Sequence, residues 1–244
     1  MKQVLLTVKE NIPLTENVYK MTLCGDCSDI TASGQFVNIK LDGLFLRRPI
    51  SVCDKDGDTL TIIYKVVGKG TEAMKELENG AVLDVLTGLG NGYDLEKSGN
   101  SPLLIGGGVG VPPMYLLAKK LIKQGKRVSV VLGFNTKSEV FYENEFKALG
   151  CEVTVTTVDG SYGVKGFVTN AMDIDYTYFY CCGPEPMLKA VYKTSNTSGQ
   201  FSFEERMGCG FGACMGCSCK TITGYKRICK DGPVLEKEEI LWED

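Results

Sequence analysis

The sequence predicts an antiparallel β-barrel, then a parallel α/β domain, then a short cysteine-rich segment. Residues 1–99 form a series of short strand-like segments, residues 100–198 alternate strand and helix, and residues 199–244 hold a dense run of cysteines. The chain has 244 residues, of which 43% are hydrophobic, so it can bury the cores of two modest domains. We place the first domain joint at Lys97–Ser101, a polar run with a glycine.

The first zone is rich in β-branched and aromatic residues, which favour strands, and turn clusters such as Asp56–Asp58 and Glu78–Gly80 separate its segments. Many short strands with little helix suggest an antiparallel barrel. The expected strands are Val4–Val8, Val18–Leu23, Phe36–Leu41, Thr59–Val66 and Val82–Leu86, with one helix at Thr71–Glu78.

The second zone begins with a short apolar run, a glycine turn and a segment with helical spacing. This alternation predicts a parallel sheet that is able to bind a nucleotide. The expected strands are Pro102–Ile105, Arg127–Gly133, Val153–Val158 and Thr177–Cys182, and the expected helices are Met114–Gln124, Phe141–Leu149 and Glu185–Tyr192.

Composition excludes several classes of function. The formal net charge is −3, and no basic stripe favours nucleic acid. The absence of histidine removes the commonest general base and the usual serine triad. The start of the chain carries charges throughout, and no run reaches the roughly 18 apolar residues of a membrane span. We therefore expect a cytoplasmic protein with no membrane contact, in which eleven cysteines indicate metal binding rather than disulfides.

Four of those cysteines follow the pattern C-x4-C-x2-C-x11-C. They are Cys209, Cys214, Cys217 and Cys229. The first three repeat the spacing of plant-type [2Fe–2S] ligands, and interleaved glycines let the backbone fold tightly around such a cluster. Structural zinc is the alternative, but zinc sites more often carry two paired C-x2-C knuckles. The spacing favours [2Fe–2S], and Cys219 is left out of the ligand set.

A glycine run, Gly106–Pro113, follows a predicted strand and opens a predicted helix. It departs from the G-x-G-x-x-G fingerprint, yet glycines let the backbone approach a pyrophosphate at a helix N-terminus. A plain strand–helix turn would look similar. The run gains weight from Cys181–Met187, a second glycine turn after a strand, since two such turns line one crevice in open α/β sheets.

In the first zone, Arg48 and Ser51 of the Leu46–Val52 segment are able to reach a diphosphate or a flavin edge. Gly68–Thr71 then opens a short helix. Each feature alone is equally typical of a surface arginine or an ordinary helix cap, so their order along the chain carries the argument.

Read in order, RPIS at 48–51, GKGT at 68–71, GGGVGVPP at 106–113 and CCGPEPM at 181–187 resemble the ferredoxin–NADP reductase superfamily. That superfamily joins a flavin-binding barrel to a nicotinamide-binding α/β domain. The added cysteine pattern is similar to the electron-transfer subunit of bacterial NAD-linked dihydroorotate dehydrogenase. The likeness runs from the first strand to the end of the chain.

The resemblance implies FAD, a [2Fe–2S] cluster and diffusible NAD, with a partner subunit carrying FMN that oxidises dihydroorotate during pyrimidine biosynthesis, usually two copies of each subunit. The cluster ligands would be the four cysteines above. FAD would be held by Arg48, Pro49, Ile50, Ser51, Ile63, Tyr64, Lys65, Gly70 and Thr71. The nicotinamide nucleotide would be held by Gly106, Gly107, Gly108, Gly110, Cys182 and Gly183.

Three alternatives stay open at this point. The small subunit of NADH-dependent ferredoxin:NADP⁺ oxidoreductase has a similar layout, but its first cluster ligand is typically aspartate, where this chain has Cys209. Sulfhydrogenase γ subunits are also similar. A zinc-stabilised, nucleotide-sensing module without turnover is the third. The stretch Gly133–Glu139 offers only Lys137 for a 2′-phosphate, so the sequence predicts NAD over NADP.

Overall fold

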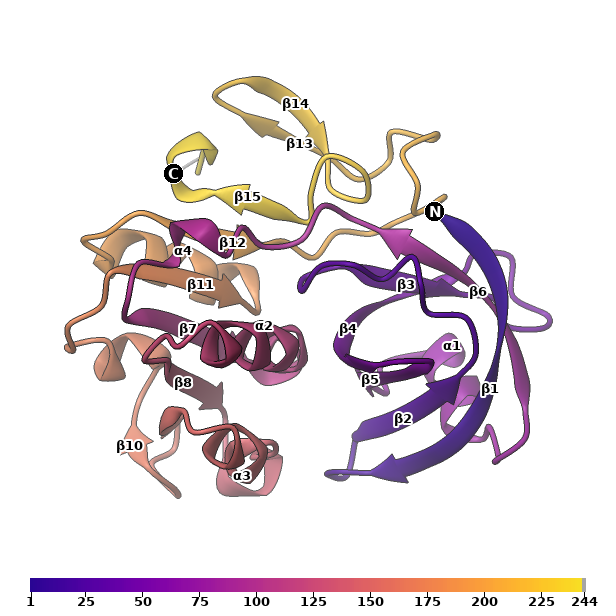
Figure 1. The fold of residues 1–244 in the computed structure, drawn as a ribbon, viewed down its shortest axis with the longest axis horizontal. Helices are drawn as coiled ribbons and strands as arrows, with labels where there is room; N and C mark the ends of the chain where they lie inside the picture. The colour runs from indigo at the N-terminus through magenta and orange to yellow at the C-terminus, as the bar shows by residue number, and fades with distance from the viewer. Residues whose placement is uncertain (243–244) are drawn as a thin grey trace.

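Six antiparallel strands close the amino-terminal barrel, in the order β1-β2-β5-β4-β3-β6 (Figure 1). The structure is a computed structural model and describes residues 1–242. Alternate residues of β1 point inward: Val4, Leu6 and Val8 are buried, whereas Leu5 is 68% exposed. The strands are β1 (Lys2–Pro13), β2 (Val18–Cys24), β3 (Phe36–Ile39), β4 (Arg48–Asp56), β5 (Thr59–Lys65) and β6 (Val82–Leu89).

Five of the six strands are those that the sequence predicted. The sixth, β4, was not predicted, because an arginine, a proline and two aspartates interrupt its apolar pattern. Pro49 cannot donate a ladder hydrogen bond, but β4 pairs with β5 only from Val52 onward, so one side of the strand is unpaired at Pro49. The helix predicted at Thr71–Glu78 is α1 (Lys69–Lys75), which begins two residues earlier.

The α/β domain contains a seven-stranded sheet in the order β10-β9-β8-β7-β11-β12-β15. All neighbours are parallel except β12 and β15. Because β7 lies between β8 and β11, the chain reverses its direction of travel across the sheet at β7, which is where such sheets bind ligands. The strands are β7 (Pro102–Gly107), β8 (Ser129–Phe134), β9 (Glu152–Thr157), β10 (Val164–Lys165), β11 (Tyr178–Cys182), β12 (Gly199–Ser202) and β15 (Val234–Glu236).

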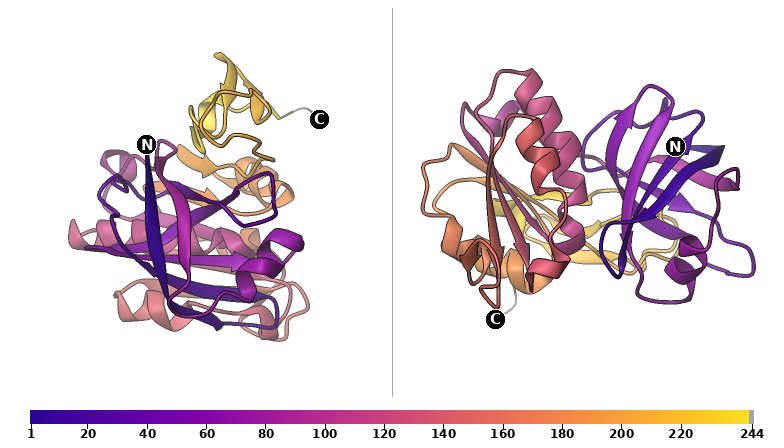
Figure 2. Two further views of the ribbon diagram at one scale, coloured as in Figure 1. Left: turned by 90° about the vertical axis from the view of Figure 1, so that its right-hand side faces the viewer. Right: turned by 90° about the horizontal axis from the view of Figure 1, so that it is seen from below.

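Helices cover both faces of this sheet, as the right-hand view of Figure 2 shows. Apolar residues of α2 (Pro112–Lys123) and α3 (Glu143–Ala148) share one core with β8, and those of α4 (Glu185–Thr194) share another with β11. Short 3-10 turns occupy Glu96–Ser98, Gly108–Gly110, Lys137–Glu139, Val168–Ala171 and Lys237–Glu239. No helix within residues 1–242 is long and apolar enough to cross a membrane.

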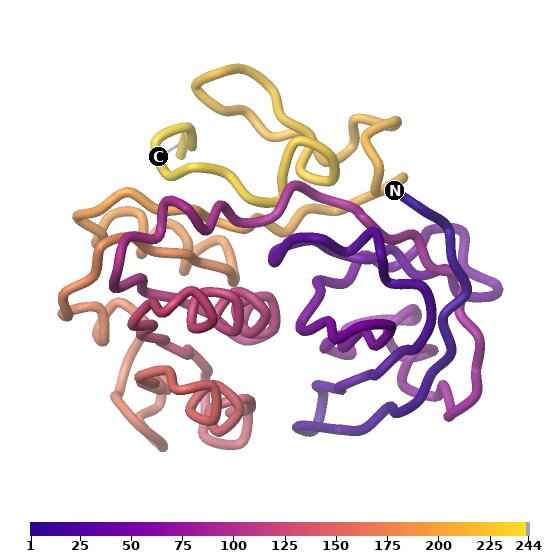
Figure 3. Tube along the Cα trace, in the orientation of Figure 1, coloured from indigo at the N-terminus to yellow at the C-terminus, as the bar shows by residue number. Residues whose placement is uncertain are grey.

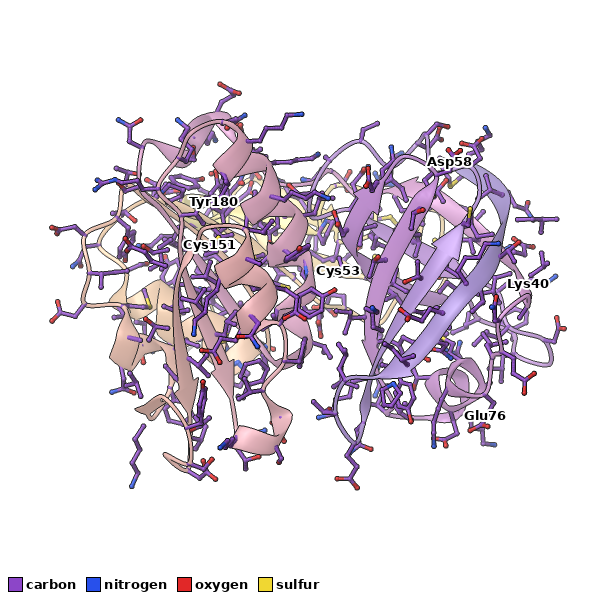
Figure 4. All side chains as sticks on the ribbon, turned by 60° about the horizontal axis from the view of Figure 1, so that its bottom comes forward. Lys40, Cys53, Asp58, Glu76, Cys151 and Tyr180 are labelled. Carbon is purple, nitrogen blue, oxygen red and sulfur yellow. The ribbon has the colours of Figure 1, made fainter. Side chains whose placement is uncertain are left out.

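Helix α2 fixes the barrel against the α/β domain. Its Lys119 ammonium lies 2.9 Å from the Asp54 carboxylate of β4, and Lys120 donates to the Thr31 carbonyl at 3.0 Å. Between them, the fully buried Cys53 of β4 joins the core of the α/β domain, and Figure 4 shows it at the junction of the two bodies. Because both apolar and charged contacts cross this junction, the two domains present one shared crevice.

The carboxy-terminal segment, from residue 199 onward, contributes two strands to the α/β sheet and is not separate from it. Strand β12 pairs with β11, and β15 pairs with β12, while the hairpin β13 (Ser218–Thr221) and β14 (Gly224–Arg227) projects beyond them. The yellow carboxy-terminal trace of Figure 3 lies over both bodies. The predicted domain boundaries stay predictions, but the segment after residue 198 shares its first strand with the α/β sheet.

Candidate functional site

Arg48 and Arg47, at the start of β4, have different surroundings. Arg47 is committed to the barrel, because it pairs with Asp84 at 2.9 Å and donates to two backbone carbonyls. Arg48 donates hydrogen bonds only to the carbonyls of Leu46 and Arg47, and no carboxylate within residues 1–242 pairs with it. A half-buried guanidinium without an anionic partner suits a diphosphate.

The rest of the predicted flavin motif lies around Arg48 on two paired strands. Pro49, Ile50 and Ser51 are half-buried on β4, and the Ser51 hydroxyl has no hydrogen bond within the described residues. On β5, Lys65 is exposed at the crevice. Ile63 packs into the α/β core, whereas Tyr64 is buried in the barrel and donates to Asn11 Oδ1 at 2.9 Å. The ring of Tyr64 is thus committed to the barrel interior.

Gly70 and Thr71 open α1 beside the same strand. The Thr71 hydroxyl caps the helix by accepting hydrogen bonds from the Val67 and Gly68 amides at 2.9 and 3.3 Å. A Cβ on Gly70 would lie 1.8 Å from Arg48 Nε, so the guanidinium rests directly on this glycine. The absence of a side chain at residue 70 therefore defines where Arg48 lies.

We expect Gly70→Ala to weaken flavin binding without unfolding the barrel. The methyl group would displace the flexible end of Arg48 and leave the backbone in place. Loss of a charge-assisted contact is worth about 1.5–3 kcal/mol, or roughly 10- to 100-fold in affinity. Flavin released on dilution and the thermal unfolding midpoint of the apoprotein would be measured. Gly57→Ala, in an open turn at φ +54°, is the control. Equal flavin retention in both variants would contradict the placement.

A cavity of about 630 Å³ opens between the two domains at the carboxyl ends of the parallel strands. Its walls combine the Thr15–Val18 turn and Lys65 of the barrel with Gly107, Gly108 and Pro184 of the two glycine turns. This is the crevice position expected for a ligand of an open α/β sheet. The cavity thus brings together the two glycine turns, which the sequence analysis had placed in one crevice only by the general rule for open α/β sheets.

The two glycine turns are packed tightly against each other. A Cβ on Gly110 would lie 2.2 Å from the carbonyl oxygen of Cys182, and one on Gly107 would lie 2.4 Å from Met187 Sδ. A Cβ on Gly106 would meet Val111 Cα at 2.8 Å. Gly183 has φ +159°, and burial holds the pKa of the Cys182 thiol well above its usual range. Gly107 and Gly108 present backbone to the cavity, a surface suited to a pyrophosphate, whereas Gly106, Gly110, Gly183 and the buried Cys182 lie outside its lining.

The far end of the cavity contains residues that sequence reasoning missed. Glu139 lines it, and its carboxylate accepts hydrogen bonds from the Asn135 amide at 3.1 Å and from Asn135 Nδ2 at 2.9 Å. Phe167, which is 64% exposed, also lines the cavity. Lys137, the cation noted in the sequence, instead lies 5.7 Å from the centre of the Tyr162 ring. An acidic residue after the second parallel strand was the available signal for Glu139.

The four predicted cluster cysteines gather as two pairs. Cys209 Sγ accepts hydrogen bonds from the Ala213 and Cys214 amides at 3.2 and 3.4 Å, and Cys214 Sγ accepts from the Cys209 amide. Cys217 Sγ accepts from the Cys229 amide at 3.4 Å. Met215, between the pairs, has φ 61°, so the loop turns sharply there. Two cysteines for each of two irons is the demand of a [2Fe–2S] rhomb.

The arrangement of the cysteines fits a single metal ion less well than it fits a two-iron cluster. Within residues 1–242, no group of three or more cysteine or acidic side chains converges as ligands of one ion. Burial acts to raise the pKa of the Cys209 thiol, but the backbone amides of Cys214, Phe211 and Ala213 outweigh it and bring the pKa down to about 6. The loop thus favours a thiolate at Cys209, and Cys219 lies apart, beside a second cavity under the β13–β14 hairpin.

Two family models match the chain. Residues 204–241 match the iron–sulfur cluster binding domain of dihydroorotate dehydrogenase B, and residues 104–193 match the oxidoreductase NAD-binding domain. The first match covers all four cysteines of the two pairs, and the second covers both glycine turns.

Curated relatives align over nearly the whole chain. An electron transfer subunit of dihydroorotate dehydrogenase B (NAD⁺) from Geobacillus sp. strain WCH70 is 44% identical over 99% of both chains. The subunit of the same name from Fusobacterium nucleatum is 46% identical over 93% of this chain and 94% of its own.

Solved structures share the fold. An NADH-dependent reduced ferredoxin–NADP oxidoreductase superposes with a TM-score of 0.89 at 30% identity, over 98% of this chain and 90% of the other. A ferredoxin–NADP⁺ reductase from Neisseria gonorrhoeae superposes with a TM-score of 0.69 at 17% identity, over 80% and 90%. The dihydroorotate dehydrogenase relatives are the more similar in sequence, and the chain belongs to the family of electron transfer subunits of NAD⁺-linked dihydroorotate dehydrogenase B.

Proposed function

We propose that this subunit passes electrons from an FMN-containing dihydroorotate dehydrogenase subunit to NAD⁺, in a cytoplasmic complex of two copies of each subunit. One observation carries the proposal: the three sites adjoin one another in one molecule. The cysteine loop contacts Asn38, and Asn38 pairs with Pro49 of the Arg48–Ser51 strand. The interdomain cavity is lined by Lys65 of the neighbouring barrel strand. When bound, the cluster supplies one-electron transfer and FAD supplies hydride exchange with the nicotinamide ring.

The chain's own residues bind and orient these groups. Arg48 would hold the flavin diphosphate, and Ser51 would reach the flavin edge. We assign further flavin contacts to Pro49, Ile50, Lys65, Gly70 and Thr71, and to the backbone of Ile63 and Tyr64, whose side chains are buried. The glycines at 106, 107, 108, 110 and 183, with Cys182, would let the nucleotide approach the backbone, and Cys209, Cys214, Cys217 and Cys229 would ligate the cluster.

An anaerobic absorption spectrum of the purified full chain tests this proposal directly. We expect flavin and [2Fe–2S] bands that bleach when NADH is added, together with two iron atoms per chain, as the cluster formula requires. A colourless, zinc-loaded chain that does not respond to NADH would overturn the proposal in favour of a nucleotide-sensing module.

We expect Glu139→Gln to relax the preference for NADH over NADPH. A carboxylate at this end of the cavity accepts hydrogen bonds from ribose hydroxyls and repels a 2′-phosphate. Removing one charge near the surface is worth about 1–2 kcal/mol, so kcat/KM for NADPH should rise roughly tenfold and that for NADH should fall only slightly. Dye reduction with each nucleotide and the Kd of NADP⁺ would be measured.

Glu143→Gln is the matched control for this charge change. Glu143 lies on α3 nearby, where it pairs with Lys147 at 2.6 Å instead of lining the cavity. If both variants gained NADPH activity equally, the effect would come from the overall field and Glu139 would not be the selecting residue.

A further inference from the structure

Asn38 is a buried polar side chain between the flavin motif and the cluster loop. It lies on β3, where its register partners are Pro49 of the flavin motif on one side and Leu86 of β6 on the other. It is 1% exposed. Phe36, two residues earlier on the same face, packs in one core with the cluster cysteines Cys217 and Cys229. Asn38 is thus a polar group in a largely apolar contact between barrel and cluster segment.

The amide of Asn38 touches the first ligand loop directly. Nδ2 donates to the Cys209 carbonyl at 3.3 Å. Because a carbonyl only accepts hydrogen bonds, this contact fixes which end of the amide faces the loop. Gly210, at φ +78°, is packed so closely that a Cβ there would lie 2.3 Å from Nδ2. Only glycine fits between the asparagine and the loop.

The other end of the same amide has no partner. Asn38 Oδ1 is buried and accepts no hydrogen bond within residues 1–242. A buried acceptor without a donor costs about 1–3 kcal/mol, whereas a leucine of similar shape would avoid that cost. If stability alone mattered, an apolar residue would be favoured at this position. The asparagine is therefore explained by its N–H group, which donates to the Cys209 carbonyl.

We propose that Asn38 is a positioning residue that holds the Cys209 loop against the flavin strand and raises the reduction potential at the cluster. The inference rests on the proposed function. The Nδ2–H group presents the positive end of its dipole to the loop whose amides donate to Cys209 Sγ. Donors around the thiolates stabilise the more negative, reduced state, and outer partners of ligands commonly tune metal sites.

The test compares Asn38→Leu and Asn38→Asp in the assembled complex. Both variants keep the shape of the side chain and remove the donor, and aspartate adds an acceptor facing the Cys209 carbonyl. We expect an EPR-monitored redox titration to give a more negative midpoint potential in both, with the larger shift for aspartate. Dihydroorotate-to-NAD⁺ turnover should fall about tenfold. The thermal unfolding midpoint of Asn38→Leu should stay near that of the unsubstituted protein.

Asn91→Ala is the control, because the Asn91 amide also ties the barrel to the cluster segment but does so at Val234, at 2.9 Å, away from the ligands. It should lower stability and leave the potential unchanged. An Asn38→Leu protein with unaltered potential and EPR spectrum would overturn the inference and leave Asn38 a packing residue. A complex that lacks a cluster signal before any substitution would instead overturn the proposed function.

Discussion

A Cys214→Ser chain should reduce a dye with NADH at close to the normal rate, while losing electron transfer between dihydroorotate and NAD⁺ by about 100-fold or more. Cys214 is the most exposed of the four cluster cysteines and pairs with Cys209 in the loop. A serine hydroxyl is a harder, weaker ligand than a thiolate for iron in a sulfide cluster. The flavin strand and the cavity lie elsewhere, so hydride exchange at the flavin should persist.

Both activities, the iron content and the flavin content would be measured on the same preparation. Cys219→Ser is the control, since Cys219 lies two residues past a ligand and faces the second cavity. It should keep both activities. If Cys214→Ser lost the dye activity as well, the cluster would support the fold in addition to carrying electrons, because metal binding and folding are then coupled.

The parts of this site that could be predicted from sequence are those whose chemistry is local. The four cysteines are spaced within 21 residues, and the glycine turns directly follow their strands, so short-range patterns were sufficient. Asn38 could not be found in this way, because its partner, Cys209, is 171 residues away. The prediction of NAD over NADP rested on the lack of an arginine that would bind a 2′-phosphate, so it did not single out Glu139, whose carboxylate would repel one.

The same dependence on short-range patterns explains why strands β4, β12 and β15 were not predicted. Strand β4 was not among the predicted barrel strands because Arg48, Pro49 and Asp54 hide its alternation, although its pairing with β3 and β5 is regular over most of its length. Strands β12 and β15 lie in a segment that shows little periodicity. They form because Phe201 and Leu235 bury their side chains against the sheet, a tertiary contact that local patterns do not report.

Among glycine-to-alanine substitutions in the nucleotide-binding domain, Gly110→Ala should cause the largest loss of NADH binding. Its Cβ would lie 2.2 Å from the Cys182 oxygen and 2.6 Å from the Gly183 nitrogen, and both are backbone atoms that have no rotamer by which to move away. Overpacking of this kind costs about 1–3 kcal/mol of unfolding free energy. The two turns must separate, and a misplacement near 1 Å costs roughly 100-fold in activity. We therefore expect kcat/KM for NADH to fall about 100-fold while the barrel keeps its flavin.

Gly125→Ala is the control that introduces backbone strain without a steric clash. Gly125 follows α2 at φ +76° with no atom near its would-be Cβ, so alanine there costs about 1 kcal/mol through strain and leaves the cavity unaltered. A Gly110→Ala protein that bound NADH normally would show that the turns can separate without consequence, and the nucleotide would then depend on Glu139 and the cavity walls. A protein that lost NADH binding but kept its flavin and cluster spectra would show that residue 110 must be glycine because the two turns are in contact there. That contact cannot be seen in the sequence of either glycine motif alone.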